Sequence, residues 1–288
     1  MKILLFGCGG QVGWELQRSL APLGELIALD FDSKSYHADF SRPEGLAATV
    51  AVIAPQVIVN AAAHTAVDKA ESEPELARTL NATAPGVLAQ AAQKLGAWLV
   101  HYSTDYVFDG SGERPWMETD APAPLSVYGR TKLEGEQLVA QHCANHLIFR
   151  TSWVYAARGG NFAKTMVRLA QERERLTVID DQWGAPTGAD LLADVTAHAI
   201  RHVQTHPEHA GLYHLVASGE TNWFQYAKHV LAGVNTAQIA TKIIAKEVAP
   251  VPTSAFPTPA QRPHNSRLNT AKLQATFGLN LPPWQRGV

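Results

Sequence analysis

A glycine-rich turn at the very start of the chain constrains the fold more than any other feature. The apolar run Ile3–Phe6 is followed at once by Gly7, Gly10 and Gly13. Glycines let the backbone bend tightly and approach a ligand closely, and the amide groups that open the next helix attract a pyrophosphate. The spacing is G-x-x-G-x-x-G, whereas classical dehydrogenases have G-x-G-x-x-G. Because the turn joins an expected strand to an expected helix, it predicts a dinucleotide-binding domain.

Apolar runs alternate with helical patterns through the first half of the chain. Strands are expected at residues 3–6, 26–29, 57–59, 98–102 and 147–149. Helices are expected at residues 11–23, 45–53, 75–95 (interrupted near Pro85) and 127–141. Strands separated by helices predict an α/β fold with a doubly wound parallel sheet of the Rossmann type. Such a sheet binds its ligands at the carboxyl ends of the strands.

The pattern changes after about residue 150. Helices are expected at residues 161–173, 191–202 and 222–231, a strand at 212–216, and a proline-rich loop from Pro250 onward. We therefore expect residues 1–150 to form the dinucleotide-binding core with the catalytic residues. Residues 151–288 are expected to form mainly a smaller substrate-binding lobe, with some segments returning to the core.

Composition excludes several classes of function. Charged residues make up 17% of the chain and the formal net charge is −2, so no strong field attracts nucleic acid or an anionic membrane. No stretch approaches the ~20 apolar residues that a membrane-spanning helix needs. Cys8 and Cys143 are the only cysteines, and they are most simply free thiols in a reducing compartment. These features favour a cytoplasmic protein without a nucleic-acid or membrane partner.

Several residues near the expected strand ends are candidates for cofactor binding. Asp30 ends the second expected strand, where a carboxylate accepts hydrogen bonds from the adenosine ribose and disfavours the 2′-phosphate of NADP. Asp39 and Phe40 are candidates for the polar partner and the apolar wall of the adenine. The other cofactor candidates lie in the glycine turn or directly after later strands: Gln11, Val12, Ala62, Ala63, Thr65 and Tyr102.

Tyr128 and Lys132 are four residues apart in an expected helix, so they share one face of it. A lysine ammonium near a phenol lowers a pKa that starts near ~10, which makes the tyrosine a usable general acid or base. Thr104 and Asp105 follow the fourth expected strand, at the edge that faces the cofactor. A hydroxyl there can hold a substrate carbonyl beside the nicotinamide. Together these residues predict a reductase site.

These motifs, in this order, resemble the extended short-chain dehydrogenase/reductases that act on nucleotide sugars. Longer stretches resemble the dTDP-4-dehydrorhamnose reductase family: residues 10–16, 60–71, 103–110, 150–155, 181–187 and 262–266. The resemblance therefore covers essentially the whole chain.

The resemblance implies NADPH- or NADH-dependent reduction of dTDP-4-dehydro-L-rhamnose to dTDP-L-rhamnose for cell-envelope polysaccharide such as O antigen. It implies that Tyr128 protonates the C4 oxygen, that Thr104 holds this oxygen, and that Lys132 lowers the Tyr128 pKa and binds the nicotinamide ribose. The implied substrate-binding residues are Thr104, Asp105, Trp153, Trp183 and Arg262.

Members of this family are often homodimers with a magnesium ion at the interface. Glu15 matches one acidic position, and Asp190 stands where glutamate is usual. The C-terminal tail adds no third acid to this implied Mg²⁺ site.

Two other functions remain open at this point. One is a non-catalytic regulatory subunit that keeps the dinucleotide fold, as in a relative that serves methionine adenosyltransferase. The other is a reductase or epimerase–reductase for a different nucleotide 4-keto sugar, which for GDP-fucose synthesis needs an additional cysteine and histidine near the sugar. Cys143 lies beyond the expected catalytic helix and is poorly placed for that chemistry. Neither the cofactor preference nor the stereochemistry at C4, rhamnose or its talose epimer, follows from these motifs.

Overall fold

A parallel sheet of six strands is the centre of the fold in the computed structural model, which describes residues 1–237 and 242–288. The order across the sheet is β10-β5-β4-β3-β1-β2, and every neighbouring pair is parallel. The strands are β1 (Lys2–Phe6), β2 (Glu25–Leu29), β3 (Val57–Asn60), β4 (Trp98–Thr104), β5 (His146–Thr151) and β10 (Gly211–His214). The chain leaves β1 toward β2 on one side and returns to β3 on the other, so the topological switch point lies between β1 and β3.

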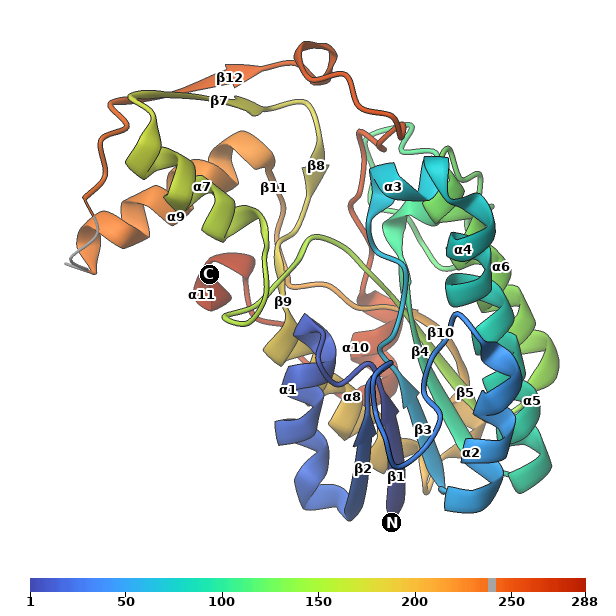
Figure 1. The fold of residues 1–288 in the computed structure, drawn as a ribbon. Coiled ribbons are helices and arrows are strands. Elements are labelled where there is room, and N and C mark those ends of the chain that lie inside the picture. The colour runs from blue at the N-terminus through green and yellow to red at the C-terminus, as the bar shows by residue number, and fades with distance from the viewer. Residues whose placement is uncertain (238–241) are drawn as a thin grey trace.

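Helices cover both faces of this sheet, which explains why its strands are mainly apolar. Ile3 and Leu5 of β1 face one core, whereas Leu4 and Phe6 face the other, and all four are fully buried. In Figure 1, α1 and α8 lie on one face, and α2, α5 and α6 lie on the other. These helices are α1 (Gln11–Leu20), α2 (Leu46–Ile53), α5 (Ala84–Leu95), α6 (Val127–His142) and α8 (Ala189–Val203). The predicted doubly wound parallel fold is confirmed.

A second group of elements lies beyond the carboxyl ends of the sheet strands (Figure 1). It contains two helices, α7 (Phe162–Glu172) and α9 (Trp223–Thr236), and a parallel strand pair, β7 (Arg175–Ile179) with β12 (Glu247–Val251). Two shorter pairs join it to the sheet: β6 (Val154–Tyr155) with β9 (Thr187–Gly188), and β8 (Trp183–Gly184) with β11 (Thr221–Asn222). Between these segments the chain returns to the sheet unit through α8 and β10.

The helix expected at 75–95 has the interruption predicted near Pro85: it consists of α4 (Pro74–Arg78), a π-helical turn at Thr79–Thr83 and then α5. Pro85 explains the interruption, because it has no N–H for the carbonyl four residues earlier and its ring crowds that turn. The pair β7–β12 was missed, and Pro250 lies inside β12, where the open edge of a two-stranded sheet needs no N–H.

Shorter elements complete the chain. The helices α3 (Val67–Ser72), α10 (Ala271–Phe277) and α11 (Trp284–Gly287) were also not predicted. Single 3-10 turns lie at Ala21–Leu23, Pro43–Gly45, Asp105–Val107, Pro207–His209 and Thr253–Ala255. None of the helices in the described residues combines the length and the apolar character that a bilayer span requires.

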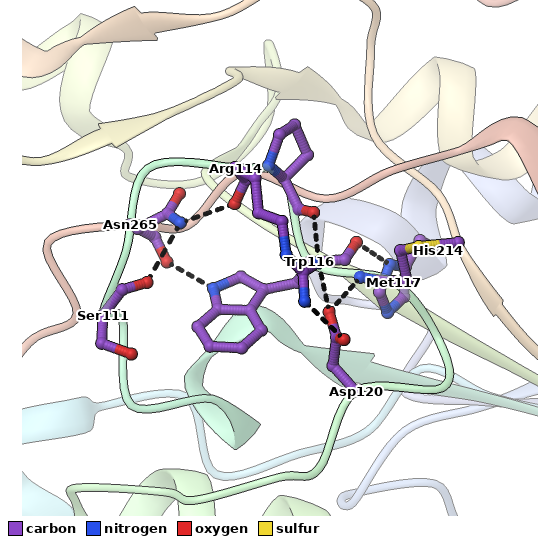
Figure 2. Close-up of polar contacts among 8 residues, drawn as sticks. Ser111, Arg114, Trp116, Met117, Asp120, His214 and Asn265 are labelled. Atoms are coloured by element: carbon purple, nitrogen blue, oxygen red, sulfur yellow. Dashed lines mark hydrogen bonds and ion pairs between the residues drawn. The ribbon is translucent and has the colours of Figure 1, made fainter.

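A polar network ties the loop after β4 to the C-terminal segment. Figure 2 shows that Asn265 Nδ2 donates to the backbone carbonyl of Arg114 at 2.8 Å. The backbone carbonyl of Asn265 accepts from Trp116 Nε1 at 3.1 Å. In the same loop, the Asp120 carboxylate accepts from the Arg114 guanidinium at 2.8 and 2.9 Å and from the Met117 amide at 2.7 Å. The network holds the segment that follows Arg262.

We expect Asn265→Ala to lower the free energy of unfolding by about 1–3 kcal/mol, because it removes a buried side-chain amide that donates to the Arg114 carbonyl and accepts from the Arg267 amide. Asn265 is only 2% exposed, so water cannot replace the amide. Urea unfolding followed by circular dichroism measures the loss. Asn280→Ala on the same C-terminal segment is the control, because Asn280 is exposed and its loss should stay within about 0.5 kcal/mol. Equal losses for the two variants would show that the network does not stabilise the fold.

Candidate active site

The glycine turn closes tightly on the loop after β3. Gly7 has φ +79°, and a Cβ there would lie 2.7 Å from the amide nitrogen of Ala62. A Cβ on Gly13 would lie 1.9 Å from the carbonyl oxygen of Gly7, so α1 can pack onto the turn only without a side chain there. The N-cap residue of α1, Gly10, brings no side-chain cap to the first amides of the helix. These features fit a pyrophosphate at the start of α1.

A cavity of about 400 Å³ lies beside this turn, at the carboxyl ends of β1 and β2. Asp30 lines it, and the two oxygens of its carboxylate accept from the amides of Gly9 and Phe31, each at 2.9 Å. Asp39 lines it too, but its carboxylate already accepts from Ser41, whose hydrogen bonds are the main cause of a lowered Asp39 pKa. The other predicted residues that line this cavity are Gly7, Gly10, Phe40, Ala62 and Ala63. The cavity has the place and the polar groups for an adenosine.

Phe31 is a residue of this cavity that sequence reasoning missed. Its side chain is 73% exposed at the rim. An apolar ring left in water beside a cavity is a candidate for stacking on a base. Its position directly after Asp30 was the only signal in the sequence that could have found it.

A second cavity of about 410 Å³ shares the Ala61–Ala63 segment with the first and continues the cleft along the sheet edge. Most of the predicted catalytic and nicotinamide-side residues line it. They are Gln11, Val12, Thr65, Tyr102, Thr104, Asp105, Tyr128, Lys132 and Trp153. Residues that lie up to about half the chain apart in sequence therefore meet in one cleft.

The start of α6 places Tyr128 in this cleft. Ser126 caps the helix, and its hydroxyl accepts from the Gly129 amide at 3.1 Å. A Cβ on Gly129 would lie 2.2 Å from the carbonyl oxygen of Tyr106, so only glycine allows the helix to approach the turn that follows Thr104. The Tyr128 ring then meets the Tyr106 ring edge to face, with 5.5 Å between centroids.

The pKa of Tyr128 moves in the direction opposite to the one predicted. Burial raises it to about 12, the Asp105 charge adds to the rise, and only the Thr104 side chain opposes it. Lys132 does not lower the Tyr128 pKa as predicted, because its ammonium group donates to the Tyr102 carbonyl instead. The phenol is therefore fully protonated at neutral pH, which is the form that can donate a proton.

Lys132 is 3% exposed and its Nζ donates to the carbonyl of Tyr102 at 2.5 Å. Burial lowers the pKa of Lys132 to about 8, and the nearby Glu136 carboxylate opposes that shift. The Tyr102 side chain points elsewhere: its hydroxyl shares a 2.6 Å hydrogen bond with Thr196 of α8. Tyr102 therefore reaches the cleft with its backbone and not with its phenol.

Thr104 and Asp105 form a small buried polar group next to Tyr128. The Thr104 hydroxyl donates to the Asp105 carboxylate at 3.1 Å and accepts from the Tyr106 amide at the same distance. Burial raises the pKa of Asp105 to about 7, against hydrogen bonds from Ser266 and Thr104. Ser103, which was not predicted, also lines the cleft, and its buried hydroxyl has no partner within the described residues.

A third cavity, of about 420 Å³, adjoins the catalytic cleft, with which it shares Tyr106 and Trp223. Arg262 lines it, and its guanidinium donates to both carboxylate oxygens of Asp68, at 2.7 and 3.1 Å. Guanidinium and aromatic groups that sequence reasoning did not assign also line this cavity: Arg173, Arg175, Phe162, Trp223 and Phe256. Such a lining suits a nucleoside diphosphate. These residues come from four separate segments, so no local motif marks them.

The two predicted tryptophans differ in position. Trp153 lines the catalytic cleft with φ +49° and stacks on Trp223 with 3.7 Å between ring centroids. Trp183 lines none of the three cavities, and its ring faces the Arg267 guanidinium at 5.2 Å instead. The short pairing of β8 with β11 turns Trp183 away, while its neighbour Gln182 faces the third cavity. The assignment of Trp183 to the substrate wall therefore stays a prediction that the lining of these cavities does not support.

The two acids considered for magnesium lie on the packed helices α1 and α8. Glu15 accepts from Arg18 at 3.4 Å, and Asp190 lies in the first turn of α8. Across residues 1–237 and 242–288, no three His, Cys, Asp or Glu side chains gather closely enough to hold a metal ion. A single copy of the chain thus does not supply the implied ligand set.

Comparison with known proteins agrees with this geometry. The family model described as the RmlD substrate binding domain matches residues 1–288. A protein of Shigella flexneri named dTDP-4-dehydrorhamnose reductase is 65% identical over 288 residues, which cover 100% of this chain and 96% of that protein.

Two crystal structures of proteins given the same name are similar over nearly the whole chain. That from Clostridium acetobutylicum has a TM-score of 0.89 at 36% identity, covering 100% of this chain and 96% of that one. That from Bacillus anthracis, in complex with NADP, has a TM-score of 0.88 at 34% identity, covering 99% and 96%. The chain therefore belongs to the RmlD substrate binding domain family, the family of the dTDP-4-dehydrorhamnose reductases.

Proposed function

We propose that this protein is an NAD(P)H-dependent reductase that converts the C4 keto group of dTDP-4-dehydro-L-rhamnose to the hydroxyl of dTDP-L-rhamnose. The observation that carries the proposal is the continuity of the cleft. Tyr128, Thr104 and Lys132 line its middle, between a cavity beside the glycine turn and a cavity rich in arginine and aromatic side chains. The relatives that carry this activity in their names match the chain from end to end.

We assign each part of the two ligands to one cavity. Asp30 and Phe40 would hold the adenosine, and the glycine turn at the start of α1 would hold the pyrophosphate. The keto sugar lies in the cleft near Trp153, and the dTDP group extends into the third cavity toward Arg262. Residues 151–288 would then act mainly as the substrate-binding lobe.

The chemistry of the chain itself is proton transfer and positioning. Reduced nicotinamide, when bound, supplies the hydride for C4. Tyr128 would donate its phenolic proton to the C4 oxygen as negative charge develops there, and its raised pKa ensures that the proton is present. Thr104 would hold the same oxygen by turning its hydroxyl away from Asp105. Lys132, charged below a pKa of about 8, would stabilise the phenolate that remains.

The proposal extends to a homodimer in the cytoplasm that contributes to cell-envelope polysaccharide such as O antigen. For the implied magnesium ion at the interface of that homodimer, one copy of the chain offers Glu15, which accepts from Arg18, and Asp190, with no third acid beside them among the described residues. The proposal disfavours an epimerase–reductase, because Cys143 is 1% exposed at the far end of α6 and does not line the cleft.

A direct assay tests the function. Purified protein is mixed with NADH or NADPH and dTDP-4-dehydro-L-rhamnose, and cofactor oxidation is followed by absorbance while the sugar product is identified by NMR. We expect oxidation only when the keto sugar is present, with dTDP-L-rhamnose as product. Binding of cofactor without any oxidation would favour the regulatory function. Oxidation only with a different nucleotide 4-keto sugar would reassign the substrate.

The rate should fall as the pH rises past about 8. Lys132 has a depressed pKa of about 8 and carries its charge below that pH, whereas Tyr128 keeps its proton up to about pH 12. The alkaline decline therefore reports Lys132, and initial rates between about pH 6 and 10 measure it. In Lys132→Arg the guanidinium stays charged, so the residual activity should lose this decline. A decline that persists in Lys132→Arg would assign it to another group, such as Asp105.

A further inference from the structure

Two buried polar residues near the catalytic lysine have no part in the mechanism above, although one of them, Asn60, lines the catalytic cleft. Asn60 of β3 and His101 of β4 are opposite each other in the sheet register, and they are 1% and 0% exposed. Their side chains are 3.1 Å apart, from Asn60 Nδ2 to His101 Nδ1, and His101 Nε2 lies 3.5 Å from Lys132 Nζ. Asn60, His101 and Lys132 thus form a continuous buried chain of contacts.

The orientation of Asn60 determines which nitrogen of His101 carries the proton. Asn60 Oδ1 accepts from the Ala62 amide at 3.0 Å, so the amide oxygen is on that side and Nδ2 must face the imidazole. Nδ2 can only donate, and His101 Nδ1 must therefore be an acceptor without a proton. Burial and the Lys132 charge hold the pKa of His101 well below its ordinary value, so the ring is neutral. A neutral ring without a proton on Nδ1 carries it on Nε2.

The His101 N–H group consequently points at the Lys132 nitrogen. An N–H directed at an ammonium is unfavourable, whereas the same N–H directed at a neutral amine makes a hydrogen bond. Among the other groups around Lys132, a carbonyl and a carboxylate favour its charge, a phenol is neutral, and one guanidinium, that of Arg150, is positive and opposes it. They are the Tyr102 carbonyl of β4, the Glu136 carboxylate of α6 with its partner Arg150 of β5, and the Tyr128 phenol one turn earlier.

We propose that Asn60 and His101 form a positioning pair in which Asn60 holds His101 as the Nε2–H tautomer, and that this N–H keeps the Lys132 proton labile. The inference rests on the proposed function, because it concerns the lysine that supports Tyr128. A lysine that gives up and regains its proton near neutral pH can help to reload the phenolate after each turnover. Both residues act through Lys132 in this proposal, which makes them positioning residues.

Asn60→Asp reverses the polarity of the pair with little change of shape. The carboxylate keeps the acceptor for the Ala62 amide and puts a second oxygen where Nδ2 was. His101 then donates from Nδ1, and the lone pair of Nε2 accepts from the Lys132 ammonium. We expect the alkaline limb of kcat/KM to move up by about one pH unit or more, with cofactor affinity retained.

The carboxylate that Asn60→Asp introduces also raises the Lys132 pKa directly through its charge. Making the same substitution in a His101→Leu background separates this charge effect from the effect of the imidazole. His101→Leu removes the N–H and should also move the limb upward. In that background Asn60→Asp acts by charge alone, and its additional shift should be clearly smaller than in the wild-type background. Equal shifts in both backgrounds, or no shift in His101→Leu, would overturn the proposal.

A measurement on the wild-type protein tests the His101 tautomer directly, so the test does not depend on whether the variants fold. Nitrogen NMR of ¹⁵N-histidine-labelled protein distinguishes the protonated ring nitrogen from the unprotonated one, and His101→Gln identifies the His101 signals. We expect Nε2 to carry the proton, and a proton on Nδ1 would overturn the proposal. Because this result does not depend on turnover, it is distinct from failure of the keto-sugar assay, which would overturn the proposed function instead.

Discussion

Replacing Tyr128 with phenylalanine should slow reduction of the keto sugar by about 10²–10⁴-fold, the usual contribution of a positioned proton donor. The change removes one oxygen from a ring that is held by its contact with Tyr106 and by the cap at Ser126, so the cleft should keep its shape. Steady-state rates measure the loss in kcat. Cofactor affinity, measured by fluorescence titration, should change little, because glycine-turn and Asp30 contacts do not involve the phenol.

Tyr213→Phe is the matched control for this variant. Tyr213 lies in β10 and donates its hydroxyl to the His209 carbonyl at 2.8 Å, and it does not line the cleft. Its loss removes one hydrogen bond but no proposed proton donor, so kcat should stay near the wild-type value. If Tyr128→Phe also turned over at nearly the wild-type rate, the assignment of Tyr128 as the acid would be wrong.

The largest expected loss of stability is that of Glu136→Gln. Glu136 of α6 and Arg150 of β5 form a bidentate ion pair at 2.8 and 2.6 Å, and each side chain is only 4% exposed. The glutamine has nearly the same shape, but it leaves the Arg150 charge buried without a counter-charge. Removing one partner of such a pair costs about 3–5 kcal/mol. Urea unfolding should show this loss in the free energy of unfolding.

Glu134→Gln on the same helix is the control. Glu134 pairs with Arg78, but these side chains are 33% and 54% exposed, so the loss should be at most about 1 kcal/mol. Equal losses for Glu136→Gln and Glu134→Gln would show that burial of the first pair does not matter. Glu136 also favours the charge of Lys132, so the folded Glu136→Gln enzyme should show its alkaline decline at lower pH.

Much of the fold could be predicted because its signals are local. Each strand of the sheet except β10 is a short apolar run in the first 151 residues, and the glycine turn that follows β1 is contiguous in sequence. The pair β7–β12 could not be predicted in this way, because its strands lie about 70 residues apart and gain their hydrogen bonds only from each other. Pro250 even argued against a strand, and only the open edge of that small sheet permits it.

In the candidate site, as in the fold, the features that depend on nearby residues could be predicted from the sequence. The spacing of Tyr128 and Lys132 on one helix face and the succession of Gly7, Gly10 and Gly13 are properties of the sequence itself, because helical geometry and a tight turn follow from nearby residues. These features were enough to indicate a dinucleotide-dependent reductase.

Only the tertiary structure decided how these groups behave. The direction of the Tyr128 pKa shift depends on burial by remote segments, and Lys132 is engaged by the Tyr102 carbonyl and His101 from the neighbouring strand. In the same way Trp153 faces the cleft while Trp183 faces Arg267. The sequence by itself determined which chemical groups the chain carries and the local elements that carry them. Their protonation and their partners were decided by packing, because solvation and electrostatic interactions depend on distances in space and not on distances along the chain.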